Sequence, residues 1–231
     1  FATDDANRFT ITKAAAPTMQ PIELTVINGL AKTYLVNLPA LPTLETPKEY
    51  GALTYEIGEI KLNDGYYTSG AKVENGKLTL PIQKNDVETT GSVGTVTVVI
   101  KSANYEDITL TVNVSAKNRI TPTGTPTLSK NAITYGDALN TIALSGKLHD
   151  NVNNVDVDGT FEWVDGTHIP VVGNGTYAAE WIFEPTDTEK YLTVSGRSNI
   201  TVEKAQQYGK LSMAGYTYSQ APSTPTLTDR T

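Results

Sequence analysis

A short phrase occurs twice in this chain, and it constrains the fold more than any other feature. Its residues recur at one constant offset: Leu128-Ser129, Thr134-Tyr135 and Ala138 return as Leu211-Ser212, Thr217-Tyr218 and Ala221. A second phrase, residues 199–205, returns at residues 9–14 and more loosely at 110–117. Repetition with this period is typical of modular arrays. The sequence therefore predicts tandem modules rather than one large domain.

The two phrases have different places within a module. The first opens a module and the second, with its Lys-Ala ending, closes one. This predicts a terminal strand of a preceding module over 1–13, modules over 14–117 and 118–205, and the start of a third module over 206–231. A length of 231 residues accommodates two domains of about 100 residues each.

The composition favours strands over helices. Hydrophobic residues make up 39% of the chain and charged residues only 19%, while Thr, Val, Tyr, Gly and Pro are frequent. This mixture suits pleated strands and turns. Long helical patterns rich in Ala, Leu, Glu and Lys are absent. We therefore expect an all-β protein.

Short apolar-polar runs separated by turn signals place the strands. In the first module we expect strands at 22–27, 33–38, 53–60, 77–82, 94–101 and 108–114. In the second we expect them at 132–135, 142–146, 159–164, 177–184 and 198–203. The dipeptide Asn75-Gly76 predicts a type I′ hairpin. The expected fold is two tandem immunoglobulin-like β-sandwich domains, flanked by partial strands of neighbouring modules.

Two further expectations concern the core and the connection between modules. Phe161 and Trp163 should share one face of their strand, and Tyr177, Ala179, Trp181 and Phe183 one face of theirs. These two strands are expected to supply the aromatic core of the second module. The stretch Lys117–Pro126, with two prolines, is expected to be a semi-rigid linker.

Charge and residue types exclude several classes of function. A net charge of −7 without a basic patch argues against nucleic acid and anionic lipid. The absence of cysteine excludes disulfides, thiolate metal sites and cysteine nucleophiles. The longest apolar run, Val96–Ile100, is too short to span a membrane. The first residue is Phe1, so we expect the true N-terminus to be missing and read nothing from the lack of a leader segment.

A family resemblance appears in the second module. It is carried by Thr134–Leu139, Gly159–Trp163, Phe183–Asp187, Tyr191 and Val202–Ala205, and in the first module by Asn104–Lys117. These stretches resemble the repeated immunoglobulin-like modules of large Gram-positive cell-surface proteins and adhesins. The resemblance implies a secreted or wall-displayed multi-module stalk or adhesin. It brings no catalytic residues to this chain.

Tyr66 and Tyr67 are the candidate ligand contacts. They lie in a glycine-flanked loop, and neighbouring residues of an extended segment point to opposite faces. At least one ring is therefore expected at the surface, where it could stack on a sugar.

The acidic stretch 150–159 offers a candidate calcium site at Asp150, Asp156 and Asp158, since calcium takes several oxygens from one flexible loop. The stretch lacks the spacing of an EF-hand. A plain turn is the preferred interpretation, because Asn and Asp bond their own backbone. We therefore predict no cofactor.

No pattern in the chain predicts an enzyme. The glycine-rich stretch 65–77 misses the spacing of a phosphate-binding loop and has no helix after it. His149 and His168 are too few and too far apart for zinc. A Lys130–Asn199 amide cross-link is conceivable, but two solvated side chains are the preferred interpretation.

Two hypotheses about function remain. The first is a non-enzymatic spacer array of a bacterial cell-surface or secreted protein, with an adhesive role left open. The second is a module that binds a carbohydrate or a host protein through loop aromatics. In both, the partners include neighbouring modules of the same chain, and the expected location is extracellular, at the cell surface or cell wall.

Overall fold

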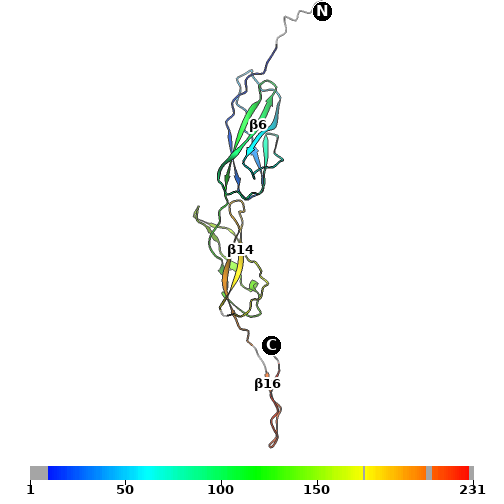
Figure 1. The fold of residues 1–231 in the computed structure, drawn as a ribbon, viewed down its shortest axis with the longest axis vertical. Helices are drawn as coiled ribbons and strands as arrows, with labels where there is room; N and C mark the ends of the chain where they lie inside the picture. The colour runs from blue at the N-terminus through cyan, green and yellow to red at the C-terminus, as the bar shows by residue number, and fades with distance from the viewer. Residues whose placement is uncertain (1–9, 174, 207–209, 229–231) are drawn as a thin grey trace, which may run out of the picture. The chain divides into compact units, whose positions relative to one another are not determined.

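The structure is a computed structural model that describes residues 10–173, 175–206 and 210–228. It divides into two compact units, with the boundary between Arg119 and Ile120 (Figure 1). Residues 1–9 of the expected terminal strand lie outside the described residues, and Thr10–Lys13 are not in a strand. Among the described residues, no helix is long and apolar enough to cross a membrane.

Within its described residues, 10–119, unit 1 contains seven strands, in line with an immunoglobulin-like sandwich. They are β1 (Ile22–Ile27), β2 (Lys32–Asn37), β3 (Leu53–Leu62), β4 (Lys72–Glu74), β5 (Lys77–Ile82), β6 (Gly91–Ser102) and β7 (Ile108–Lys117). One sheet has the order β1-β7-β6-β3, and the other has the order β2-β5-β4. The first strand β1 lies parallel to the last strand β7, and the other neighbours are antiparallel.

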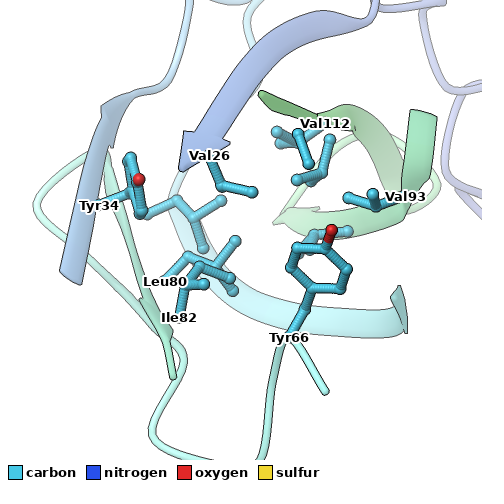
Figure 2. Close-up of a cluster of buried hydrophobic side chains, with 11 residues drawn as sticks. Val26, Tyr34, Tyr66, Leu80, Ile82, Val93 and Val112 are labelled. Carbon is cyan, nitrogen blue, oxygen red and sulfur yellow. The ribbon is translucent and has the colours of Figure 1, made fainter. Parts of the chain in front are cut away.

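The core of unit 1 lies between its two sheets (Figure 2). Every second residue of β7, from Ile108 to Ala116, is buried, as the period of a half-buried strand requires. Leu78, Leu80 and Ile82 of β5 face them from the other sheet. Apolar burial on both inner faces is what holds the sheets together.

The hairpin expected at Asn75-Gly76 is confirmed. It joins β4 to β5 with Glu74 paired to Lys77, and φ is 50° at Asn75 and 71° at Gly76. Positive φ at both central residues defines a type I′ turn. Asn and Gly reach this geometry at the lowest steric cost.

Unit 2 holds the remaining strands. They are β8 (Thr127–Leu128), β9 (Ala132–Thr134), β10 (Leu144–Ser145), β11 (Leu148–Asp150), β12 (Val155–Val157), β13 (Gly159–Trp163), β14 (Thr176–Pro185), β15 (Val194–Glu203), β16 (Lys210–Ser212) and β17 (Thr226–Thr228). The main sheet has the order β13-β14-β15-β9, and β8-β10, β11-β12 and β16-β17 form two-stranded sheets. A short 3-10 helix spans Leu139–Thr141.

The aromatic core expected for the second module is confirmed. Trp181 and Phe183 are buried on β14, and Phe161 of β13 packs against both rings at centroid distances of 5.5 and 4.7 Å. Ala179 is buried on the same face of β14. The alternation of apolar and polar residues along both strands thus identified the buried face correctly.

The acidic stretch is not a single loop. Asp150 ends β11 and Asp156 lies in β12, and the two strands form a hairpin in which Asp150 pairs with Val155. The turn is limited to residues 151–154, with Asn154 at a positive φ of 54°. Val157 alternates with polar neighbours and is buried, so packing against the core extends the strand into the acidic stretch.

Gly196 of β15 lies under the ring of Trp181, its antiparallel partner on β14. A Cβ at position 196 would collide with the indole, which is buried and cannot move aside. We expect Gly196→Ala to destabilise unit 2 by about 1–3 kcal/mol, the usual cost of overpacking a core. Urea unfolding should show this, with Gly173→Ala as a control, since a Cβ there meets no atom within 4 Å. Equal midpoints for the two variants would contradict the packing described.

The repeated phrase folds in the same way in both places. Strand β8 pairs with β10 through Leu128↔Leu144, and β16 pairs with β17 through Leu211↔Leu227, which are the positions that the repeat aligns. The following turn also recurs. Asp137 accepts a hydrogen bond from the backbone N–H of Thr134, as Gln220 does from Thr217. The sequence phrase therefore encodes a particular hairpin and turn.

Candidate contact residues and the ends of the modules

Tyr66 lies in the core rather than at the surface. Its side chain is 1% exposed and points between the sheets (Figure 2), and its hydroxyl donates to Asn28 Oδ1 at 2.7 Å. Burial raises the pKa of Tyr66, which the hydrogen bond to Asn28 partly offsets. The ring has no free face for a sugar, so the expectation of a glycan contact at Tyr66 does not fit this structure.

Tyr67 follows in the same segment, which is not a strand, and packs against the same core cluster. It is half-buried, packs at the edge of the core of unit 1, and its hydroxyl accepts a hydrogen bond from the backbone N–H of Ala71 at 3.1 Å. Part of its surface is open to solvent. A ligand contact at Tyr67 stays a prediction.

Asn28 organises one end of unit 1. It is buried, and its amide Nδ2 donates to Thr89 O at 3.0 Å and to Asn118 Oδ1 at 2.7 Å, while its Oδ1 accepts from Tyr66. Asn118 in turn donates to Glu88 O at 2.9 Å. These bonds tie the turn after β1, the segment before β6 and the residue after β7 to one another.

Asp150 anchors the β11–β12 hairpin. Its side chain is 0% exposed, and it accepts hydrogen bonds from the backbone N–H groups of Val152 and Asn153, the Asn153 amide and the Tyr191 hydroxyl. The Lys190 ammonium lies 3.7 Å away. Burial raises the pKa of this carboxyl, but the hydrogen bonds outweigh burial and lower its pKa to about 2. Every strong contact of the carboxylate is thus made within the protein.

The three carboxylates of the candidate calcium site have separate partners. Asp156 lies 3.3 Å from Nδ1 of His149, and Asp158 lies 2.7 Å from Nζ of Lys147. Asp150 faces the inside of its own turn. Within the described parts of the chain, no group of three or more His, Cys, Asp or Glu side chains could hold a metal ion. The structure therefore does not bring Asp150, Asp156 and Asp158 together around one ion.

Lys130 and Asn199 both lie at the surface. Asn199 is exposed on β15, and Lys130 is exposed just before β9. The parallel register between β15 and β9 pairs Thr201 with Ala132, so the two residues are near each other along the same pair of strands. An amide cross-link needs a desolvated lysine, whereas the side chain of Lys130 is exposed to water.

A hollow of about 520 Å³ opens in unit 1, where the segment between β2 and β3 covers the end of the longer sheet. Its apolar lining includes Leu38, Leu41, Leu44, Tyr50, Leu53 and Tyr55. Tyr50 donates its hydroxyl hydrogen to the Pro42 carbonyl at 2.7 Å, which ties two parts of the covering segment to each other. The prolines of this segment were the sequence signal for irregular backbone here.

Each unit begins with the same backbone contact, which we call the N-terminal latch. In unit 1, Ala14 forms a parallel bridge beside Tyr105, with bonds of 2.9 Å to Asn104 and 2.8 Å from Glu106. In unit 2, Ile120 forms a parallel bridge beside Tyr191, with bonds of 2.8 Å to Lys190 and 2.9 Å from Leu192. Both tyrosines are buried.

The latch leaves no linker between the units. Arg119 donates from its guanidinium to the Gly29 carbonyl of unit 1 at 3.4 Å, and the next residue, Ile120, is latched in unit 2. Thr123 of the expected linker is also bound, by two backbone hydrogen bonds to His149 of unit 2. The semi-rigid linker expected over Lys117–Pro126 is therefore part of the two units themselves.

Sequence reasoning missed the residues that form these module ends. In the sequence, Asn28-Gly29 indicates no more than a turn, although a buried Asn must find hydrogen-bond partners. Tyr105 and Tyr191 entered only through the family resemblance. Their shared place, three residues before the first residue of β7 and of β15, was the available signal.

The comparisons with known proteins concern the fold. No family model matches the chain, and no curated protein matches it. Among solved structures, it is similar to the third to sixth extracellular cadherin domains of protocadherin gamma B2, at 12% identity and a TM-score of 0.30 over 91% of this chain and 55% of that one. It is similar to Drosophila N-cadherin EC1-4, at 12% identity and a TM-score of 0.29 over 85% of this chain and 51% of that one.

A third similar structure is murine CEACAM1b, at 15% identity and a TM-score of 0.26, where 80% of this chain covers 99% of that chain. The chain spans about half the length of the cadherin structures that it matches. The fold assignment itself rests on the strand order and on the buried faces described above. The chain is an all-β protein of two tandem immunoglobulin-like β-sandwich units.

Proposed function

We propose that this chain is a non-enzymatic structural region of an extracellular multi-module protein, in which the modules serve as spacers. The observation that carries the proposal is the junction, where Arg119 is held in unit 1 and Ile120 in unit 2. A repeat array needs modules that fold and connect to their neighbours. Direct connection without free residues suits a spacer, because a flexible chain between modules would let them reorient freely.

The recurring ends of the modules support the same proposal. The latch at Ala14 has the pattern of the latch at Ile120, although the residues around them differ. The β16–β17 hairpin repeats the β8–β10 hairpin in register. On this proposal residues 14–117 and 118–205 are complete modules, residues 1–13 close a preceding module, and residues 206–231 open a third one.

The finer assignment is a bacterial cell-surface or cell-wall protein of the Gram-positive type. Its support is the resemblance of the repeated phrases together with the absence of cysteine from the sequence. The partners on this assignment are neighbouring modules of the same chain. The binding alternative is less favoured, since Tyr66 is buried and the Tyr67 hydroxyl is engaged with Ala71.

The proposal predicts that the two units tumble together in solution. NMR relaxation of the backbone amides should give the same rotational correlation time for unit 1 and unit 2. After insertion of Gly-Ser-Gly-Ser between Arg119 and Ile120, each unit should show its own, shorter correlation time, because a flexible chain replaces the direct connection.

The same insertion between Pro222 and Ser223 is the matched control. It lies in an exposed segment between β16 and β17 and should leave the correlation times of both units unchanged. Independent tumbling of the units in the native chain would contradict a spacer that limits bending.

A further inference from the structure

Each unit has a parallel pair that joins a strand near its N-terminal end to a strand much later in the chain. In unit 1, β1 pairs with β7, and in unit 2, β9 pairs with β15. When the two ends of a module are pulled apart, such strands must slide along each other. Sliding loads all of their hydrogen bonds at once instead of opening them one by one. A parallel pair of this kind therefore opposes a pull on the two ends more strongly than strands whose bonds open singly.

Unit 1 has one continuous contact between these strands. Six consecutive residue pairs run from Ile22↔Val112 to Ile27↔Lys117, and the Asn28 N–H continues them with a 2.9 Å bond to Lys117 O. Side chains add cross-links on the exposed face. Asn113 donates to Glu23 at 2.7 Å, and the hydroxyls of Thr25 and Ser115 are 3.2 Å apart.

The N-terminal segment of unit 2 makes several short contacts instead of one long one. The latch at Ile120 is followed by the bridge of Thr123 with His149, the two pairs of β8 with β10 and the three pairs of β9 with β15. Each contact belongs to a different partner strand or segment. Short contacts in series give way one after another, so the peak force is set by the largest single one.

We propose that this chain bears tension with a fixed order of yielding, in which unit 2 unfolds before unit 1. The role goes beyond that of a spacer, which only needs modules that fold and connect. Unit 2 would lengthen first under load and keep unit 1 folded. The difference rests on a continuous contact of six pairs against separate contacts of at most three.

Single-molecule force spectroscopy on the full chain tests the order. Unit 1 holds more residues between its latch and its last strand, so its unfolding releases more extended chain at about 3.5 Å per residue. The two events can thus be told apart. We expect the shorter extension first in nearly every trace. If the longer extension comes first, or if the order is random, the proposal is overturned.

A substitution at Tyr135 tests the contact itself. Its backbone N–H donates to Glu203 O at 2.8 Å at the end of the β9–β15 pair, while its side chain is 51% exposed. Tyr135→Pro removes the donor, and Tyr135→Ala keeps it. At constant force, the Pro variant should unfold unit 2 about fivefold faster than the Ala variant, since one backbone hydrogen bond contributes about 1 kcal/mol.

Unit 1 serves as the internal reference in these traces. Its event should be unchanged in both Tyr135 variants, and Asn113→Ala should lower the force of the unit 1 event alone. Should Tyr135→Pro leave unit 2 unfolded before any load is applied, the Asn113 variant and the native order still decide the question. If unit 2 unfolds at the same rate in the Pro and Ala variants, the contact between β9 and β15 is not the one that resists the force. If the order of unfolding is not as proposed, the spacer function is still tested separately by the rotational correlation times of the two units.

Discussion

Tyr66→Ala is expected to destabilise unit 1 by about 3–5 kcal/mol, the range for removing a large aromatic side chain from a core. The ring of Tyr66 is among the largest fully buried side chains and packs in the cluster of Val26, Leu80 and Val112 (Figure 2). Its removal leaves a cavity and also takes the partner from Asn28 Oδ1. Urea unfolding should show the loss in the transition of unit 1, while that of unit 2 stays in place.

Two matched variants separate the parts of this effect. Tyr66→Phe keeps the ring and leaves a buried amide oxygen without its donor, which costs about 1–3 kcal/mol. Tyr67→Ala removes a half-buried ring from the edge of the core and should cost less than Tyr66→Ala. A Tyr66→Ala chain as stable as the native one would contradict the buried position. The prediction also bears on binding assays, because any binding lost in Tyr66→Ala would report lost folding.

Asp150→Ala is expected to lower the melting temperature of unit 2 by roughly 10 °C, given the usual relation of stability to melting temperature in a domain of this size. The substitution leaves two turn N–H groups and the Tyr191 hydroxyl without their acceptor inside the protein. A buried donor without a partner costs the full price of its desolvation. Asp156→Ala is the control, since that carboxylate is exposed and lies beside His149 at the surface. Equal melting temperatures for the two variants would show that Asp150 does not anchor the hairpin.

The same carboxylate gives unit 2 an acid-dependent stability. Its pKa is lowered from 3.8 to about 2 in the folded state. A group with a lowered folded pKa stabilises the fold above its unfolded pKa, and this contribution is lost as pH falls toward the folded pKa. Unit 2 should therefore lose stability between about pH 4 and pH 2. Melting in Asp150→Asn should show a flatter dependence over this window, and an unchanged slope would contradict the assignment.

The sequence predicted the elements whose signals are local. The hairpin at Asn75-Gly76 needs only two residues that accept positive φ, and it forms as expected. The aromatic face of Trp181 and Phe183 follows from alternation within one strand. The fold class follows from many such signals together.

Other expectations depended on contacts between distant segments. Alternation along an extended segment predicts that Tyr66 and Tyr67 point to opposite sides. Only the position of the sheets decides that Tyr66 is buried in the core and that Tyr67 lies at its edge. The acidic stretch became a hairpin because Val157 packs on the core of unit 2. The expected linker lost its freedom because Arg119 and Ile120 found partners far away in the sequence.

By itself the sequence determined the period of the repeat, the fold class and the turn at Asn75-Gly76, because each of these signals lies in residues close in the chain. The hairpins that the repeated phrase forms, with the pairs Leu128↔Leu144 and Leu211↔Leu227, appeared only in the structure. The tertiary structure alone decided how modules begin and end. The latches at Ala14 and Ile120 and the parallel pairs β1–β7 and β9–β15 join segments that the folded core brings together, so no local pattern can specify them.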